Sequence, residues 1–137
     1  MKLFLEIITP TKVVLSEEVD EITLPTVNGE ISILPNHIDL LTKIKPGEMT
    51  IHRNGKIELF AITGGFLEIS SNKVSILADH AIHADNIEIA KAEQAKERAE
   101  KAMKDKASDK DYAVANAELR KALLELKVAR KHKVRNQ

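Results

Sequence analysis

The spacing of apolar residues changes once along the chain, near residue 84, and this change limits the folds that the chain can adopt. Before it, apolar residues come in short runs that often alternate with polar ones, as Ile22 and Leu24 do around Thr23, and such a two-residue period is typical of half-buried strands. After it, small apolar residues recur every three or four positions, which is typical of amphipathic helices. The sequence therefore predicts an α+β chain, with an antiparallel β-sandwich over residues 1–84 and an antiparallel two-helix hairpin over residues 85–137.

Turn-forming residues divide the first part into short strands. Proline has no amide hydrogen to give to a strand ladder, so we expect strands to end at Pro10, Pro25 and Pro35. Asn54-Gly55 predicts a type I′ hairpin turn, because both residues tolerate positive φ angles. Gly64-Gly65 lacks two side chains in succession, which predicts a bend or the close approach of another backbone.

The second part is interpreted as two helices that meet near Ala107-Ser108-Asp109. The spacing of Asp85 and Glu88 is that of a capping box, which predicts that the first helix starts there. The predicted seam between the helices is rich in alanine and consists of Ala92, Ala95, Ala99 and Ala102 in the first helix and Tyr112, Ala115, Leu119, Ala122, Leu123 and Leu126 in the second. Because alanine buries little apolar area, the hairpin should open at a low free-energy cost and so serve as a switch. A permanently closed hairpin is the alternative.

Composition limits the classes of function. Acidic and basic residues balance over the 137-residue chain, but residues 1–84 carry 7 Lys and Arg against 11 Asp and Glu, and residues 85–137 carry 14 against 10. The absence of cysteine excludes disulfides and thiolate chemistry and permits a reducing compartment.

No apolar run approaches the roughly 20 residues of a membrane helix, and the N-terminal run, interrupted by Glu6, does not resemble a signal peptide. We expect membrane association only through partners.

No catalytic arrangement can be assembled from the sequence. Asp79, His80, His83 and Asp85 have side chains of the kind that bind metals, but they match no zinc motif, and a polar linker between the two parts is the better interpretation. His37 has no nucleophile or paired acid that can be placed beside it. We therefore expect neither a metal site nor enzymatic activity.

A basic segment ends the second predicted helix. Lys127, Arg130, Lys131 and Lys133 follow Leu126 with no acid between them. These cations can complement the helix dipole, or they can form a surface for an acidic protein partner. A nucleic-acid-binding helix is a further alternative, although aromatic residues make up only 3% of the chain, too few to stack bases.

The segment from Asn28 to Leu41 predicts a docking loop. A turn at Asn28-Gly29 leads into a strand that Pro35 stops, and Asn36-His37 should form an exposed tip. Ile38, Leu40 and Leu41 should then return to the core. A short loop with a proline corner between apolar anchors suits docking better than catalysis, and an ordinary β-turn is the alternative.

Four segments, in order along the chain, resemble the epsilon subunit of bacterial F-type ATP synthases. The first is Gly29-Glu30-Ile31-Ser32-Ile33-Leu34-Pro35-Asn36-His37, which is close to the family pattern Gly-Glu-x-x-Ile-x-Pro-x-His. The others are Thr63-Gly64-Gly65-Phe66-Leu67-Glu68-Ile69, Asn72-Lys73-Val74-Ser75-Ile76-Leu77-Ala78-Asp79, and Asp111-Tyr112-Ala113 followed by Ala117-Glu118-Leu119.

This resemblance implies a β-sandwich of ten strands and a helical hairpin in a non-catalytic subunit of the rotor's central stalk. The implied partners are the gamma subunit, the membrane c-ring and the alpha and beta subunits of the catalytic sector, and no nucleic acid. The subunit would lie peripherally at the cytoplasmic face of the bacterial cell membrane and would couple proton flow to ATP synthesis. Its helices would regulate ATP hydrolysis by moving between a folded and an extended form.

The resemblance also implies roles for particular residues. Glu30, Leu34, Pro35 and His37 match the family's loop that faces the c-ring. The basic residues Lys127, Arg130, Lys131 and Lys133 would inhibit hydrolysis by facing acidic residues of the catalytic subunits.

Some members of the family bind ATP in the hairpin, through a motif near Ile-Asp-x-x-Arg-Ala and through arginines on the second helix. The matching residues here are Ile87, Glu88, Lys91, Ala92, Arg98 and Lys121. Lys91 lacks the planar fork with which arginine grips phosphate, and Glu125, near an expected arginine, would repel it. We therefore expect only weak, regulatory ATP binding and no other cofactor.

Overall fold

The structure is a computed structural model that describes residues 2–105 and 108–135. The chain divides into two compact units, Met1–His83 and Ala84–Gln137. The strands of the first unit are β1 (Leu3–Ile8), β2 (Val13–Val19), β3 (Glu21–Thr26), β4 (Gly29–Ile33), β5 (Leu40–Ile44), β6 (Gly47–Arg53), β7 (Lys56–Ile62), β8 (Gly65–Ser70), β9 (Lys73–Ala78) and β10 (Ala81–His83). The second unit contains the short 3-10 helix η1 (Ala84–Asn86) and the helices α1 (Ile89–Lys104) and α2 (Asp109–Arg135).

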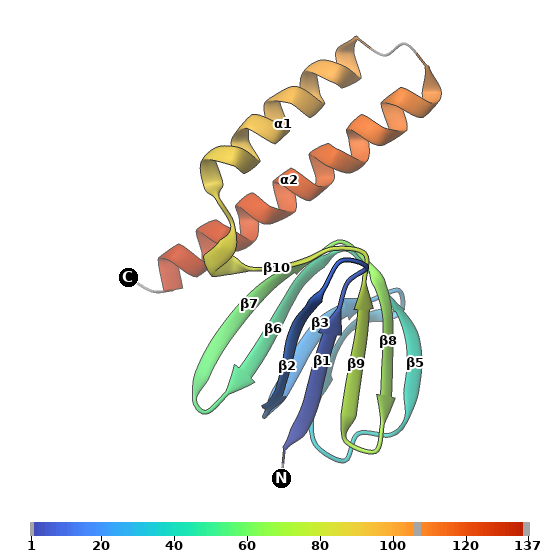
Figure 1. The fold of residues 1–137 in the computed structure, drawn as a ribbon, viewed down its shortest axis with the longest axis vertical. Helices are drawn as coiled ribbons and strands as arrows, with labels where there is room; N and C mark the ends of the chain where they lie inside the picture. The colour runs from blue at the N-terminus through green and yellow to red at the C-terminus, as the bar shows by residue number, and fades with distance from the viewer. Residues whose placement is uncertain (1, 106–107, 136–137) are drawn as a thin grey trace. The chain divides into compact units, whose positions relative to one another are not determined.

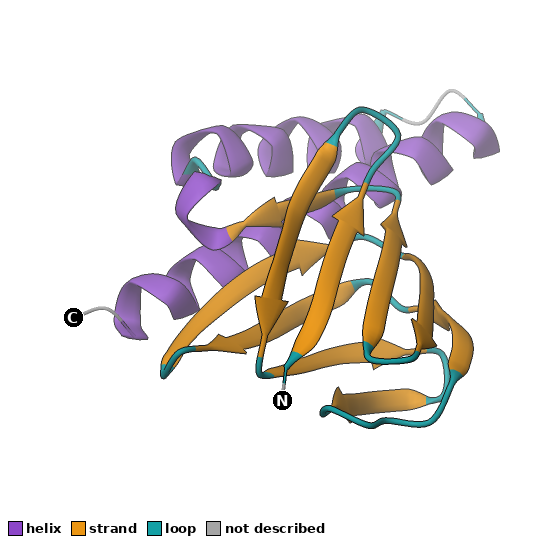
Figure 2. Ribbon diagram, turned by 60° about the horizontal axis from the view of Figure 1, so that its bottom comes forward, coloured by secondary structure: helices purple, strands orange, loops and turns teal. Residues whose placement is uncertain are grey.

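The strands form one sheet that folds over on itself as a sandwich (Figure 2). Their order is β10-β7-β6-β3-β5-β8-β9-β1-β2, with β4 paired to β3. Neighbouring strands run antiparallel, whereas β1 and β9 run parallel. The predicted α+β class, a β-sandwich followed by two helices, is confirmed.

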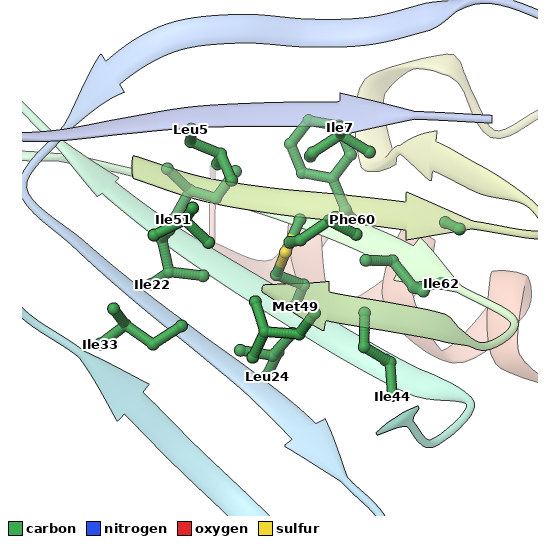
Figure 3. Close-up of a cluster of buried hydrophobic side chains, with 14 of the residues drawn as sticks. Leu5, Ile7, Ile22, Leu24, Ile33, Ile44, Met49, Ile51, Phe60 and Ile62 are labelled. Atoms are coloured by element: carbon green, nitrogen blue, oxygen red, sulfur yellow. The ribbon is translucent and has the colours of Figure 1, made fainter. Parts of the chain in front are cut away.

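The interior of the first unit is apolar (Figure 3). Alternate residues of β1, namely Leu3, Leu5 and Ile7, have no exposed area, as the two-residue period of a strand requires. Side chains from other strands point toward one another across this interior, among them Ile22, Leu24, Ile33, Ile44, Met49, Ile51, Phe60 and Ile62. Full burial of each such side chain contributes about 1.5–3 kcal/mol, so these residues supply most of the driving force for folding of the unit.

Two of the predicted turns have the expected backbone. Asn54 and Gly55, between β6 and β7, have φ angles of 52° and 78°, as a type I′ hairpin turn requires. Gly65 has a φ of 142°, and a Cβ atom on it would lie 2.0 Å from the carbonyl oxygen of Leu77 on β9. The predicted close approach of a second backbone at Gly64-Gly65 is therefore confirmed.

Pro25 does not end a strand, so that prediction is wrong. β3 continues through it to Thr26, and Pro25 pairs with Glu30 of β4. Along its other edge, β3 pairs with β6 up to Thr23 and with β5 at Thr26, and the Pro25 carbonyl accepts a hydrogen bond from Lys45. The missing amide hydrogen falls where β3 changes partner, so the ladder loses no bond.

The polar segment after β9 is more than a linker. Ala81–His83 forms β10, which pairs antiparallel with β7 from Ile62 to Phe60. The His83 ring meets the Phe60 ring edge-on, with 4.8 Å between centroids. This strand was not predicted, because three residues are too few for a recognisable period and the pairing depends on the distant β7.

The first helix starts later than predicted. Its N-cap residue is Glu88, whose side chain makes no capping hydrogen bond, and Asp85 lies in η1. The predicted capping box is therefore wrong. At the start of α2, the Ser108 hydroxyl accepts a hydrogen bond from the Asp111 amide at 3.1 Å, as an N-cap does. Ala107, which the predicted helix junction included, lies outside the described residues.

The two helices pack side by side along a seam of small side chains (Figure 1). Its buried members are Ala92 and Ala99 of α1 and Ala115, Ala122, Leu126 and Ala129 of α2. Tyr112 and Leu123, predicted to lie on the seam, are 41% and 44% exposed, and Ala102 is also exposed. The seam is narrower than predicted and is still rich in alanine. Of the helices in the described part of the chain, none has the length and apolar character needed to cross a bilayer.

Candidate interaction surfaces

Hydrogen bonds fix the loop between β4 and β5. The His37 amide donates to the Leu34 carbonyl at 3.1 Å, which closes a turn around Pro35 and Asn36. The Asn36 amide donates to Oδ1 of Asn72 at 2.6 Å and so attaches the loop to the turn between β8 and β9. Asn36 has a φ of 70°, a left-handed conformation that asparagine tolerates. A loop held in this way loses little conformational entropy when a partner docks.

The residues predicted to face the c-ring fall into two places. Leu34, 53% exposed, lies in the loop beside Pro35 and His37, which are half-buried. The His37 ring is oriented by its Nδ1, which lies 2.8 Å from the Ile38 carbonyl oxygen. Glu30 is exposed near the start of β4, roughly 13 Å from Leu34 at about 3.3 Å per strand residue. The structure therefore brings Leu34, Pro35 and His37 together and leaves Glu30 apart.

Ile38 and Leu41 do not return to the core, so that prediction is wrong. Their side chains are 78% and 70% exposed. β5 begins only at Leu40, which packs against the core, and the strand alternation then turns Leu41 outward and Ile44 inward. Ile38 precedes the strand and extends the apolar surface of the loop. We call Leu34, His37 and Ile38 the loop tip.

A second apolar surface lies on the outer side of the sheet. Phe66 on β8 is opposite Leu77 on β9, and Leu77 is opposite Ile8 on β1. Phe66 and Leu77 are 49% and 54% exposed, although their strands supply buried residues at alternate positions. Lys43 on β5 is opposite Phe66, with its Nζ 6.0 Å from the ring centroid. We call Phe66, Leu77 and Ile8 the sheet-face row.

Acidic residues border the sheet-face row. Glu68 and Glu6 occupy the outward positions next along β8 and β1, and each is opposite Ser75 on β9. The surface therefore combines an apolar row with two carboxylates, a combination typical of protein contact sites. Sequence reasoning missed this surface, although apolar residues at the outward positions of two alternating strands were a signal for it.

The basic residues of the second helix lie on the last third of α2. Lys127, Arg130, Lys131 and Lys133 are all exposed. Arg130 Nη2 lies 3.3 Å from Glu93 Oε1 on α1, so the packed hairpin already engages this cation.

The residues of the expected ATP motif differ in accessibility. Ile87 and Ala92 are buried, at 9% and 4% exposure, whereas Arg98 and Lys121 are exposed. Lys91 Nζ lies 3.2 Å from Glu88 Oε2, so these two residues form a surface ion pair with each other. A phosphate would have to compete with Glu88 for this lysine.

The candidate metal ligands lie on different elements. Asp79 and His80 lie between β9 and β10, His83 Nε2 lies 3.9 Å from Glu58 Oε1, and Asp85 contacts His132 on α2. Within residues 2–105 and 108–135, no group of three or more His, Asp or Glu side chains is arranged to hold a metal ion.

Each of the two units matches a known protein family. The family model of the ATP synthase delta/epsilon chain β-sandwich domain matches residues 2–84, and that of the delta/epsilon chain long α-helix domain matches residues 85–130. The ATP synthase epsilon chain of Herpetosiphon aurantiacus is 48% identical over 130 residues, which cover 95% of this chain and 96% of the relative. That of Chloroflexus aggregans is 44% identical over 135 residues, covering 98% and 97%.

Solved structures share the fold. A chain in the cryo-EM structure of the Euglena gracilis mitochondrial ATP synthase OSCP/F1/c-ring superposes with a TM-score of 0.67 at 21% identity, covering 99% of this chain and 82% of that one. A chain of the Tetrahymena thermophila mitochondrial ATP synthase central stalk/c-ring gives a TM-score of 0.61 at 18% identity, covering 94% and 97%.

The two matched domains, in this order and over nearly the whole chain, define the class: the chain belongs to the delta/epsilon family of ATP synthase subunits. The two bacterial relatives narrow this class, because each matches at least 95% of this chain and each is an ATP synthase epsilon chain. The resemblance to the epsilon subunit that the four sequence segments carried is thereby confirmed.

Proposed function

We propose that the chain is a non-catalytic subunit of the central stalk that joins the gamma subunit to the c-ring and couples proton flow to ATP synthesis. The observation that carries the proposal is the presence of two separate exposed apolar surfaces on one β-sandwich, the sheet-face row and the loop tip. A subunit that links two partners needs two such surfaces, both accessible in the folded unit.

The sheet-face row suits the gamma subunit. It crosses three neighbouring strands, about 10 Å from β8 to β1 at roughly 4.8 Å per strand, so one extended or helical segment can cover it. Glu6 and Glu68 border the row, which favours a partner segment with basic residues beside its apolar ones. The alternation of β8 and β9 fixes these side chains on a rigid sheet, so contact costs little ordering of the backbone.

The loop tip suits the c-ring. Leu34 and Ile38 offer a small apolar contact, and the bond from Asn36 to Asn72 keeps the loop in place. Association with the cytoplasmic face of the cell membrane would then be peripheral and would depend on the complex. Glu30, set apart on β4, would make a separate polar contact with the rotor.

Exchanging apolar residues for serine on one surface at a time tests this assignment. Phe66→Ser with Leu77→Ser should weaken binding of the gamma subunit by at least about tenfold in a calorimetric titration, because central apolar contacts dominate interface energetics. Leu34→Ser with Ile38→Ser should leave gamma binding unchanged and lower proton-coupled ATP synthesis in membrane vesicles. His37→Gln and Glu30→Gln, made separately, test the two polar positions in the same vesicles.

Each pair of variants controls for the other, since all four side chains are about half exposed or more and their loss should not unfold the unit. If the sheet-face pair binds gamma as well as the wild type does, the sheet-face row is not the gamma surface. If the loop-tip pair and both polar variants leave coupling intact, the c-ring contact lies elsewhere.

We further propose that the hairpin restrains ATP hydrolysis when α2 leaves α1. An alanine-rich seam makes this separation inexpensive, and α2, with 27 residues, is about 40 Å long at 1.5 Å per residue. An extended α2 would then present its basic residues to acidic groups of the alpha and beta subunits. Each exposed ion pair contributes at most about 1 kcal/mol, so several must act together.

Removal of residues 109–137 should therefore raise the ATPase activity of the assembled enzyme without loss of assembly. Charge reversal at Lys127 and Lys131 should produce part of this effect, and high salt should reproduce it, because salt screens exposed charges. Unchanged hydrolysis in both the truncated and the charge-reversed enzymes would exclude a regulatory role for the hairpin.

We propose that regulatory ATP binds the hairpin only weakly, with a dissociation constant of about 1 mM or higher. This corresponds to a binding free energy of at most about 4 kcal/mol in magnitude. The pairing of Lys91 with Glu88 and the exposure of Arg98 and Lys121 support this proposal. Calorimetry on the isolated chain measures the affinity, and a micromolar dissociation constant would show that the motif works despite its substitutions.

A further inference from the structure

Two side-chain contacts join the last third of α2 to the start of the second unit. Arg130 Nη2 lies 3.3 Å from Glu93 Oε1 in the first two turns of α1, across 37 positions of sequence. His132 Nε2 contacts Asp85 Oδ1 in η1, across 47 positions. Because an ionised carboxylate only accepts hydrogen bonds, the His132 ring donates through Nε2–H.

These contacts lie at the end of the hairpin where it can open. α1 and α2 are connected through residues 105–108, so α2 can leave α1 only by separating first at the opposite end, near η1 and the start of α1. The buried side chains near this end are Ile87 and Ala92 at the start of the unit and Leu126, Val128 and Ala129 of α2. Separation at this end also breaks the two polar contacts, which therefore oppose the first step of opening together with these buried apolar side chains.

We propose that Asp85 and Glu93 form an acidic clasp that holds His132 and Arg130 and thereby sets the ratio of closed to open hairpins. Arg130 is one of the cations through which the open hairpin is proposed to restrain hydrolysis. Glu93 therefore competes, within the chain, with the acidic groups of the catalytic subunits for the same guanidinium. This regulatory consequence rests on the proposed function, whereas the clasp itself does not.

The clasp is a weak restraint, as a switch requires. The side chains of Arg130 and Glu93 are 62% and 54% exposed, so water screens their attraction. His132 is more enclosed, at 18% exposure, while Asp85 is 64% exposed. Among the described side chains, the other charges near this end include Glu88 and Lys91, which pair with each other, and the exposed Lys127, Lys131 and Lys133 of α2. Loss of either clasp contact should therefore shift the open-to-closed ratio by only about two- to fivefold.

Fluorescence energy transfer in the full-length chain measures this ratio. The chain has no cysteine, so Ala90→Cys and Val134→Cys, both at exposed positions near the opening end, allow specific labelling. The clasp variants are Glu93→Gln and Asp85→Asn, which remove a charge and keep the shape. Glu97→Gln is the matched control for loss of a negative charge, because Glu97 is exposed and lies one turn further along α1 than Glu93.

The measurement is made in urea at the concentration that opens half of the labelled wild-type hairpins, where a shift in either direction is visible. Each clasp variant should raise the open-to-closed ratio about two- to fivefold and the double variant about tenfold, whereas Glu97→Gln should match the wild type. A double variant that opens no more than Glu97→Gln would overturn the clasp.

Assay of the assembled enzyme separates the clasp from the regulatory proposal. The double variant should hydrolyse ATP more slowly than the wild type, because more hairpins are open and Arg130 is released. Arg130→Gln should open the isolated hairpin as Glu93→Gln does but should restrain hydrolysis less than Glu93→Gln does. Opening of the isolated hairpin with unchanged hydrolysis would uphold the clasp and refute the proposed role of the hairpin.

Discussion

Gly65 shows how one residue determines whether two strands can pair. It is opposite Ala78 in the β8–β9 ladder, and its φ of 142° is a conformation that side chains rarely allow. A Cβ atom here would lie 2.0 Å from the Leu77 carbonyl oxygen, far inside van der Waals contact. Because Phe66 and Leu77 flank this point, the same glycine positions two residues of the sheet-face row.

We expect Gly65→Ala to lower the free energy of unfolding of the first unit by about 3 kcal/mol or more, because the methyl group forces β8 and β9 apart. Urea denaturation of the full chain, followed by β-sheet circular dichroism, measures this loss. Gly29→Ala is the control, since Gly29 has a φ of 111° but open space around its Cβ position. Gly29→Ala should lower the free energy of unfolding by only about 1–2 kcal/mol. Equal losses for Gly65→Ala and Gly29→Ala would contradict the steric argument.

The hairpin seam shows how an element can be well formed and still weakly held. α1 and α2 bury mainly methyl groups against each other, at Ala92, Ala99, Ala115 and Ala122. Each helix is supported within itself, α2 by the Ser108 cap and α1 by pairs such as Lys96 with Glu100 at 3.9 Å. Such helices can separate without unfolding, since little apolar area is exposed when the seam opens.

Ala99→Leu should destabilise the closed hairpin by about 1–3 kcal/mol, because the seam has no room for three further carbon atoms at a residue that is 1% exposed. Energy transfer between labels on α1 and α2 measures the change. Ala102→Leu adds the same atoms at an exposed position of the same helix and should change stability by no more than about 0.5 kcal/mol. Indistinguishable variants would mean that the helices do not pack along this face.

For the whole molecule, the division into two units leads us to expect that the first unit folds without the second. Unit Met1–His83 has its own apolar core, and unit Ala84–Gln137 has its own seam. The boundary expected from the change of period lay between residues 84 and 85, one residue beyond the division between the compact units. The opposite charge balances of the two parts fit units with different partners.

A chain of residues 1–84 should therefore fold alone as a β domain, with a cooperative urea transition and a β-type circular dichroism spectrum. It should also bind the gamma subunit as the full chain does, because the sheet-face row lies entirely within it. A noncooperative transition would show that the helical unit is needed for folding. The control is the full chain, whose β-sheet signal should unfold at nearly the same urea concentration.

Much of the architecture could be predicted from the sequence because it depends on local rules. The two-residue period of Ile22 and Leu24, the positive φ angles at Asn54-Gly55 and the small residues of the helix seam are each encoded within a few positions. The loop after β4 was predicted for the same reason, since Pro35 acts on its own strand. Short motifs also sufficed to indicate the family, because they reflect local constraints on backbone and surface.

The remaining features depend on which distant segments meet, and no local pattern encodes that. Pro25 lies inside β3 because the change of partner from β6 to β5 falls beside it, and Ala81–His83 is a strand because β7 is there to pair with it. Asp85 contacts His132 rather than capping a helix, since folding of the hairpin brings together side chains 47 positions apart. Leu41, Phe66 and Leu77 are exposed on one outer face of the sheet for the same reason. The spacing of residues along a strand determines which side chains share a face. Only the pairing and packing of distant strands determines which of the two faces is covered.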